Sequence, residues 1–232
     1  MAASVALAAL CVDRHFMKLH WGPVSPFVRK VMITAHEVGV VERIELVRSF
    51  VAMNQANPAV MAHNPLSKIP TLVTDDGVAL FDSDVICEYL DQLGDHPRLF
   101  PSAGEPRWTA LRWNALGSGF MDALVLWRNE RMRPDGHQSM PTLQAYSQKV
   151  DATLAWIEQG VDAFGARPFS IGHVALGCAL GYLDLRFDDL NWREGRPRTA
   201  AWMRAFMQRP SAQSTHAEVA DKLLPPTEQK TG

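Results

Sequence analysis

The sequence predicts a two-domain protein with a mixed α/β front half and an all-helical back half. Over residues 17–94, short apolar runs typical of strands alternate with segments whose apolar residues recur at helical spacing. Residues 95–104 contain two prolines and little periodicity, which is typical of a linker. Only helical spacing follows over residues 105–224, and residues 225–232 are expected to form a flexible tail.

The front half begins with an expected strand at residues 18–21, which Gly22 and Pro23 interrupt. Ser25 and Pro26 then predict the start of a helix, with serine as the N-cap and proline at the first helical position. Apolar residues recur behind them at helical spacing and predict one buried face.

Three further strands are expected, at residues 44–47, 69–73 and 78–81. A short helical turn from Asn57 precedes the second of these, and Asp76-Gly77 predicts a tight antiparallel hairpin between the last two. A helix N-capped by Asp82 or Ser83 follows. Right-handed crossovers predict that the first strand pairs are parallel.

The back half is expected to contain four helices, at residues 107–131, 143–164, 170–187 and 197–207. The third has an unusually apolar centre, VALGCALGYL, which indicates burial on all sides. No internal repeat is present in the sequence.

Composition excludes several classes of function. The 232 residues carry 23 Lys plus Arg and 25 Asp plus Glu, a formal net charge of −2, so no general attraction to nucleic acid or an anionic membrane is expected. No apolar run reaches the about 20 residues of a membrane span. Cys11, Cys87 and Cys178 stand far apart without metal-ligand spacing, so we expect reduced thiols, no metal and a cytoplasmic location.

Residues 1–16 are small and apolar but lack the positively charged start of a signal peptide. We interpret them as a disordered or misassigned extension, with a weak export signal as the alternative.

Three short motifs follow one another in the front half: SPFVRKV at residues 25–31, NPLSKIPTL at 64–72 and FDSDVICEYLD at 81–91. Together with ARPFSIGHVALGCALGYLD at 166–184, they resemble the glutathione S-transferase superfamily, and in particular its bacterial members of unassigned substrate. The resemblance covers most of the chain from Met17. It implies a thioredoxin-like N-terminal domain and an all-α C-terminal domain.

The resemblance implies roles for the residues of the first two motifs. Ser25 would face the sulfur of glutathione, and the backbone of Ile69 would pair with its cysteinyl part. Pro70 would follow a cis peptide bond and hold that backbone in place. Lys68 would approach the glycine carboxylate of glutathione.

In the third motif, Asp82 and Ser83 would hold the γ-glutamyl amine and carboxylate, assisted by the N-terminus of their helix. Many relatives carry arginine next, whereas this chain has Asp84. That departure changes the charge beside the γ-glutamyl carboxylate. A second departure lies at Ser170-Ile171-Gly172-His173, where the family has a Ser/Thr-x-x-Asp capping box. We expect a neutral histidine to be a poorer reciprocal cap than a carboxylate, so that His173→Asp would raise stability.

The chemistry expected at Ser25 is activation of a thiol. A thiol with a pKa near 8.5 is only a few per cent thiolate at pH 7, and the thiolate is the nucleophile. Lowering that pKa by about two units requires about 2.7 kcal/mol of preference for the anion. A hydroxyl that donates to the sulfur supplies roughly 1.5–3 kcal/mol, and a helix N-terminus adds about 0.3–1 kcal/mol. These two contributions suffice without an internal base.

The leading hypothesis is therefore a cytoplasmic, homodimeric glutathione transferase that conjugates glutathione to an electrophilic small molecule. A non-catalytic binding or regulatory protein with the same fold is one alternative, because Asp84 stands in place of arginine. A glutathione-dependent reductase is another, disfavoured because Ser25 stands where such members carry cysteine. The second-substrate pocket is expected beside the first long helix, lined by Met121, Leu124, Trp127 and Arg128.

Overall fold

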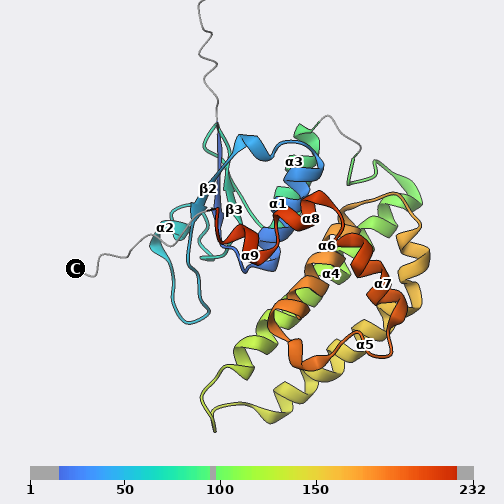
Figure 1. Ribbon diagram of the computed structural model, residues 1–232. Helices are drawn as coiled ribbons and strands as arrows, with labels where there is room; N and C mark the ends of the chain where they lie inside the picture. Colours follow the sequence, from blue (N-terminus) through green and yellow to red (C-terminus); the bar gives the residue numbers. More distant parts are fainter. Residues whose placement is uncertain (1–15, 95–97, 224–232) are drawn as a thin grey trace, which may run out of the picture.

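The computed structural model describes residues 16–94 and 98–223 and shows two packed domains (Figure 1). The expected N-terminal extension, the start of the linker and the C-terminal tail lie in the other residues, outside this description. No described helix is both long enough and apolar enough to cross a membrane.

The N-terminal domain has the predicted element order. It consists of β1 (Met17–Trp21), α1 (Pro26–Glu37), β2 (Ile44–Arg48), α2 (Pro58–Met61), β3 (Thr71–Val73), β4 (Ala79–Leu80) and α3 (Ser83–Leu93), with a 3-10 turn at Val41–Arg43. The four strands form one sheet in the order β2-β1-β3-β4. α1 and α3 cover one face of this sheet and α2 lies on the other (Figure 1).

The direction of β3 corrects one expectation. β1 and β2 are parallel, with Leu19 beside Leu46, as predicted. β3 is antiparallel to β1, with Leu19 beside Leu72. The right-handed crossover rule governs only connections between parallel strands. Residues 49–70 instead leave and re-enter the sheet at the same end, so β3 runs back along β1. The β3–β4 hairpin is antiparallel as expected.

The C-terminal domain contains the four expected helices and two short ones. They are α4 (Gly104–Arg131), α5 (Met140–Gly165), α6 (Ile171–Arg186), α7 (Pro197–Phe206), α8 (Pro210–Ser214) and α9 (Ala217–Ala220), with a 3-10 turn at Asp188–Leu190. α6 is the buried central helix. Two glycines allow its close packing: a Cβ on Gly117 of α4 would lie 2.6 Å from the Ala175 carbonyl carbon, and one on Gly177 would lie 2.1 Å from Phe206.

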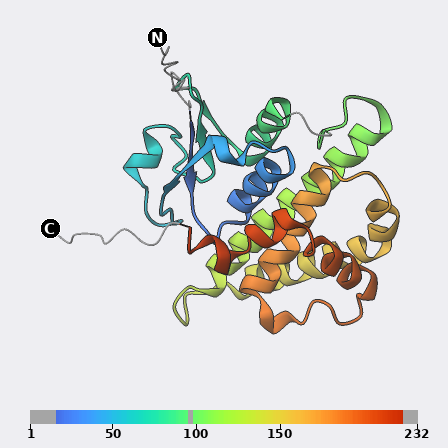
Figure 2. The ribbon, with the colours of Figure 1, turned by 45° about the horizontal axis from the view of Figure 1, so that its top comes forward.

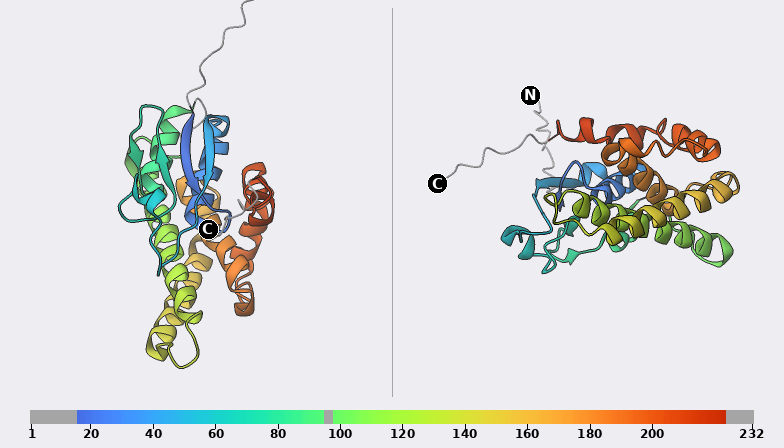
Figure 3. Two further views of the ribbon diagram at one scale, coloured as in Figure 1. Left: turned by 90° about the vertical axis from the view of Figure 1, so that its left-hand side faces the viewer. Right: turned by 90° about the horizontal axis from the view of Figure 1, so that it is seen from below.

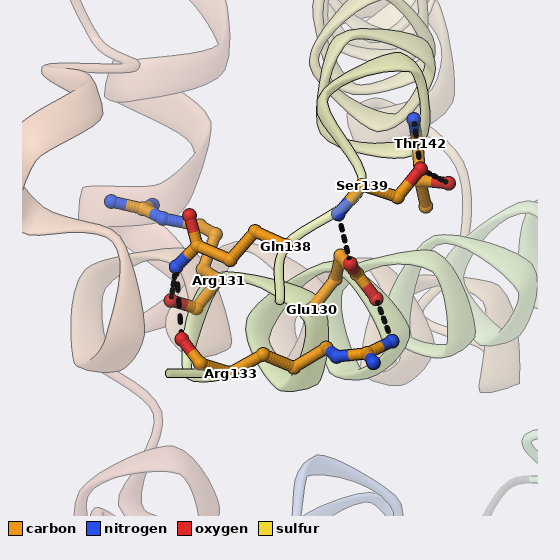
Figure 4. A network of polar contacts seen from close by, with 6 residues as sticks. All are labelled: Glu130, Arg131, Arg133, Gln138, Ser139 and Thr142. Carbon is orange, nitrogen blue, oxygen red and sulfur yellow. Dashed lines mark hydrogen bonds and ion pairs between the residues drawn. The ribbon is translucent and has the colours of Figure 1, made fainter. Parts of the chain in front are cut away.

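The connection between α4 and α5 is held by polar contacts within one turn of each helix (Figure 4). The Ser139 N–H donates to Glu130 Oε1 over 2.6 Å. Gln138 Nε2 donates to the carbonyl oxygens of Arg131 and Arg133 over 2.8 and 3.1 Å. Ser139 also N-caps α5, because its Oγ accepts from the Thr142 N–H at 3.4 Å. These bonds fix the antiparallel α4–α5 pair.

The start of α6 shows how His173 replaces the carboxylate of a capping box. Its Nδ1 accepts from the Ser170 N–H at 3.1 Å, and its Nε2 donates to the Phe164 carbonyl at 3.2 Å. The ring stacks on Phe164 with centroids 3.9 Å apart. Burial lowers the pKa of His173 to about 4, so the neutral ring that these bonds require is the form present at pH 7.

The chain returns to the first domain after α7 (Figure 2). Arg209 forms a two-bond ion pair with Glu37 of α1, at 2.9 and 2.6 Å. Arg29 of α1 donates to the Ala212 carbonyl at 3.1 Å. α1 therefore lies between the α8–α9 segment and α4, which is visible when the molecule is turned (Figure 3).

Candidate functional site

Ser25 occupies the predicted position at the N-terminus of α1. Its backbone is extended, and its Oγ accepts from the Val28 N–H at 3.3 Å, so it is the N-cap that the sequence predicts. The side chain is half-buried rather than turned into the core. It borders a cavity of about 190 Å³ between α1, α6 and α9.

The segment with Lys68, Ile69 and Pro70 lies against the loop that leads to Ser25. A Cβ on Gly22, three residues before Ser25, would come within 3.0 Å of Ile69 Cδ1, so the two loops touch. The Ile69-Pro70 peptide bond is cis, as expected. Among the described residues, no partner takes the backbone N–H or C=O of Ile69. The segment that leads into β3 therefore offers one free donor and one free acceptor next to the loop that leads to Ser25.

Two buried polar residues hold this segment. Asn64 Nδ2 donates to Thr71 Oγ1 at 3.0 Å and to the Lys68 carbonyl at 3.3 Å. Thr71 Oγ1 in turn donates to the same carbonyl at 2.8 Å. The Lys68 side chain is exposed. Its backbone is thus fixed while its ammonium group is free to meet an anion in solution.

Asp82 and Ser83 begin α3. Asp82 is the N-cap, because its Oδ1 accepts from the Asp84 N–H at 2.9 Å, and its carboxylate is exposed. Ser83 is buried at the first helical position. Unpaired N–H groups at such a helix start favour a negatively charged group.

Asp84 belongs to a polar cluster that sequence reasoning did not find. Lys30 of α1 is fully buried, and its ammonium pairs with Asp84 and donates to Ser118 Oγ of α4 at 3.0 Å. Asn114 Nδ2, one turn earlier in α4, donates to Asp84 Oδ1 at 2.7 Å. The only signal in the sequence is a lysine beside the apolar face of a helix, which does not name its partners.

Two of the four residues expected to line a second-substrate pocket lie in the core instead. Met121 and Leu124 have no exposed surface and belong to the core between α4 and α6. Trp127 is largely buried and stacks on Phe187 with centroids 5.0 Å apart, but it also lines a cavity of about 500 Å³ together with Met140 and Leu143 of α5. Helical spacing marks the apolar face of α4, and α6 covers that face. Arg128 is half-buried and does not line this cavity.

The histidines and cysteines have other roles. His20 Nε2 lies 3.0 Å from His63 Nδ1, and Ser49 Oγ lies 2.8 Å from His20 Nδ1. Burial, and then the charge of His63, lower the pKa of His20. Cys87 and Cys178 are fully buried, and burial raises the pKa of their thiols to about 12 and 11. The described residues contain no group of three or more metal-ligating side chains.

A thioredoxin-like domain with a cis-proline beside a helix N-terminus, followed by an all-α domain, is the architecture of the glutathione S-transferase fold. Family models agree: the glutathione S-transferase N-terminal domain matches residues 24–93, and the C-terminal domain matches residues 140–205. The chain belongs to the glutathione S-transferase superfamily.

Similar proteins include an uncharacterised GST-like protein, YibF, of Escherichia coli strain K12. It is 30% identical over 201 residues, which are 84% of this chain and 96% of YibF. A glutathione transferase family member from Pseudomonas fluorescens Pf-5, solved with bound glutathione, is 41% identical at a TM-score of 0.83. The match covers 86% of this chain and 98% of that one. A glutathione S-transferase from Methylobacillus flagellatus, also with glutathione bound, is 36% identical at a TM-score of 0.77, with the same coverage.

Proposed function

We propose that this protein binds glutathione and transfers it to an electrophilic small molecule. Ser25 donates its hydroxyl hydrogen to the glutathione sulfur and stabilises the thiolate, which attacks an electrophilic carbon. The N-terminus of α1 adds the positive end of its dipole at the same point. The free backbone of Ile69 beside the Ser25 loop is the observation that carries the proposal, because it matches the two hydrogen bonds that a cysteinyl backbone offers.

The rest of the tripeptide is proposed to lie between Lys68 and the start of α3. The exposed Lys68 ammonium pairs with the glycine carboxylate. Asp82 binds the γ-glutamyl ammonium, and Ser83 with the free N–H groups of α3 binds the γ-glutamyl carboxylate. Glutathione-bound structures of relatives at 41% and 36% identity support a glutathione site in this fold.

We further propose a homodimer in the cytoplasm. Trp108 at the start of α4 is 70% exposed and Val85 of α3 is 48% exposed, and apolar surface of this kind favours burial against a partner. Analytical ultracentrifugation tests this part of the proposal. A monomer at micromolar concentration would refute it.

Ser25→Ala tests the mechanism. Loss of a hydrogen bond to a charged sulfur should reduce kcat/KM for glutathione and chlorodinitrobenzene by about 10- to 150-fold and shift the rising, acidic limb of the pH profile to higher pH. Ser139→Ala is the matched control, because Ser139 is also an N-cap serine, with a 3.4 Å bond to Thr142 N, but lies at the start of α5. Equal activities in the two variants would exclude the role of Ser25.

Retention on immobilised glutathione without turnover would instead support the non-catalytic binding or regulatory protein. The reductase alternative gains no support, because Cys87 and Cys178 are buried and no other cysteine lies in the described residues.

A further inference from the structure

Lys30 is a lysine whose side chain has no solvent-exposed surface. Its side chain is 0% exposed, in the middle of α1, and its ammonium contacts one carboxylate, Asp84, and one hydroxyl, Ser118 Oγ. A buried ammonium is costly unless it is paired and hydrogen-bonded. A leucine or methionine would fill this position without the cost of burying a charge. The presence of a lysine here is therefore better explained by a function of its charge than by packing.

The place of Lys30 relates it to both ends of the candidate site. It lies on the helix that Ser25 caps. Its partner Asp84 is the residue after Ser83, and the Asp84 N–H is held by Asp82 Oδ1 at 2.9 Å. The Lys30 ammonium therefore contacts the residue that directly follows the pair proposed to hold the γ-glutamyl group, Asp82 and Ser83.

The charges around this point are mostly negative. Asp82 and Asp84 come from α3, and Asp122 continues the face of α4 that carries Asn114 and Ser118 at four-residue spacing. Partial burial raises the pKa of Asp122; Lys68 and Lys30 oppose this shift, and Asp82 and Asp84 reinforce it. The facing charged groups are thus three carboxylates and two lysines, of which only Lys30 is buried. Without Lys30, Lys68 alone would offset the three carboxylates that a ligand carboxylate meets here.

We propose that Lys30 is a specificity-determining residue: its buried charge lets an acidic helix start accept the α-carboxylate of the γ-glutamyl group. This inference rests on the proposed function. Lys30 does not touch the ligand. It acts through Asp84 and through its field, so it discriminates ligands that carry this carboxylate from ligands that lack it.

Two peptides separate this role from a structural one. Glutathione carries the α-carboxylate, and 4-aminobutyryl-cysteinyl-glycine keeps the amine, the thiol and the glycine carboxylate but lacks it. The ratio of their affinities, measured by titration calorimetry at pH 7, is the readout. A purely structural role for Lys30 would weaken both peptides alike and leave the ratio unchanged.

Removing the charge of Lys30 and removing the charge of Asp84 should change the preference for glutathione in opposite directions. Lys30→Met should lower the preference for glutathione by about tenfold, the size of one unit charge several ångströms away in a partly screened site. Asp84→Asn should raise the preference by a similar factor, and the double variant should return it to near the wild-type value. Asp84→Asn and the double variant keep the test decisive if Lys30→Met does not fold.

Lys68→Met is the matched control for removal of a lysine. It should weaken both peptides equally, because both keep the glycine carboxylate. If the wild-type protein binds neither peptide, the proposed function is refuted. If it binds both and the ratio stays constant across the Lys30 and Asp84 variants, only the role of Lys30 is overturned.

Discussion

His173 should make the helical domain sensitive to acid, and His173→Gln should remove that sensitivity. In the folded protein the ring is 3% exposed, accepts from the Ser170 N–H and donates to the Phe164 carbonyl. Its pKa is about 4, against 6.5 for an unperturbed histidine. Between these values the unfolded chain binds a proton that the folded chain does not, so stability falls as pH falls below 6.5.

The size of the effect follows from that interval. About 2.5 pH units at about 1.36 kcal/mol each correspond to about 3 kcal/mol of unfolding free energy, lost between pH 6.5 and 4. Glutamine keeps an acceptor for the Ser170 N–H and does not titrate. It loses the ring stacked 3.9 Å from Phe164, so the variant should be about 1–3 kcal/mol less stable at pH 7.

Urea unfolding followed by tryptophan fluorescence at pH 7, 6, 5 and 4.5 measures both effects. The wild-type and His173→Gln curves of unfolding free energy against pH should converge toward pH 4.5. Curves that run parallel over this range would refute the assignment of a neutral, buried His173.

His173→Asp gives the same reasoning a second test. From the sequence alone, aspartate is the better reciprocal cap. The structure reverses the expected sign, because an aspartate would place a carboxylate in the aromatic cluster around Phe164 and leave the Phe164 carbonyl without its donor. A higher melting temperature for His173→Asp would contradict this.

Two further substitutions test packing and capping. Gly177→Ala should lower the free energy of unfolding by about 1–3 kcal/mol in thermal unfolding, because its Cβ would lie 2.1 Å from Phe206. The control Gly119→Ala has open space around it and should be neutral or stabilising. Equal effects of the two substitutions would argue against close packing of Gly177 on Phe206. Burial would raise the pKa of Glu158, but hydrogen bonds from Thr199 and Arg198 outweigh burial and lower this pKa to about 2. The contribution of Glu158 to the free energy of unfolding is therefore fully present above pH 4.5 and is lost as the pH falls below that value. Glu158→Gln should therefore speed hydrogen exchange at the Thr199 amide, which donates to Glu158 at 2.8 Å, and an unchanged rate would exclude this cap.

Much of the fold could be predicted because its signals are local. The N-caps at Ser25 and Asp82 act on N–H groups within three residues, and the Asp76-Gly77 turn joins strands that are neighbours in the chain. The cis bond before Pro70 was expected from the resemblance of a nine-residue motif to the family. The caps and the turn depend on a few consecutive residues, so the sequence by itself determined them.

Other features depend on residues far apart, and only the tertiary structure decided them. The direction of β3 depends on where residues 49–70 re-enter the sheet. Met121 and Leu124 belong to the core rather than a pocket because α6, fifty residues away, covers them. Lys30, Asp84 and Ser118 meet from three helices. Apolar spacing shows that a face is buried but not against what, and a charge in the sequence does not name its partner. Which faces and which charged groups contact each other depends on how the whole chain packs.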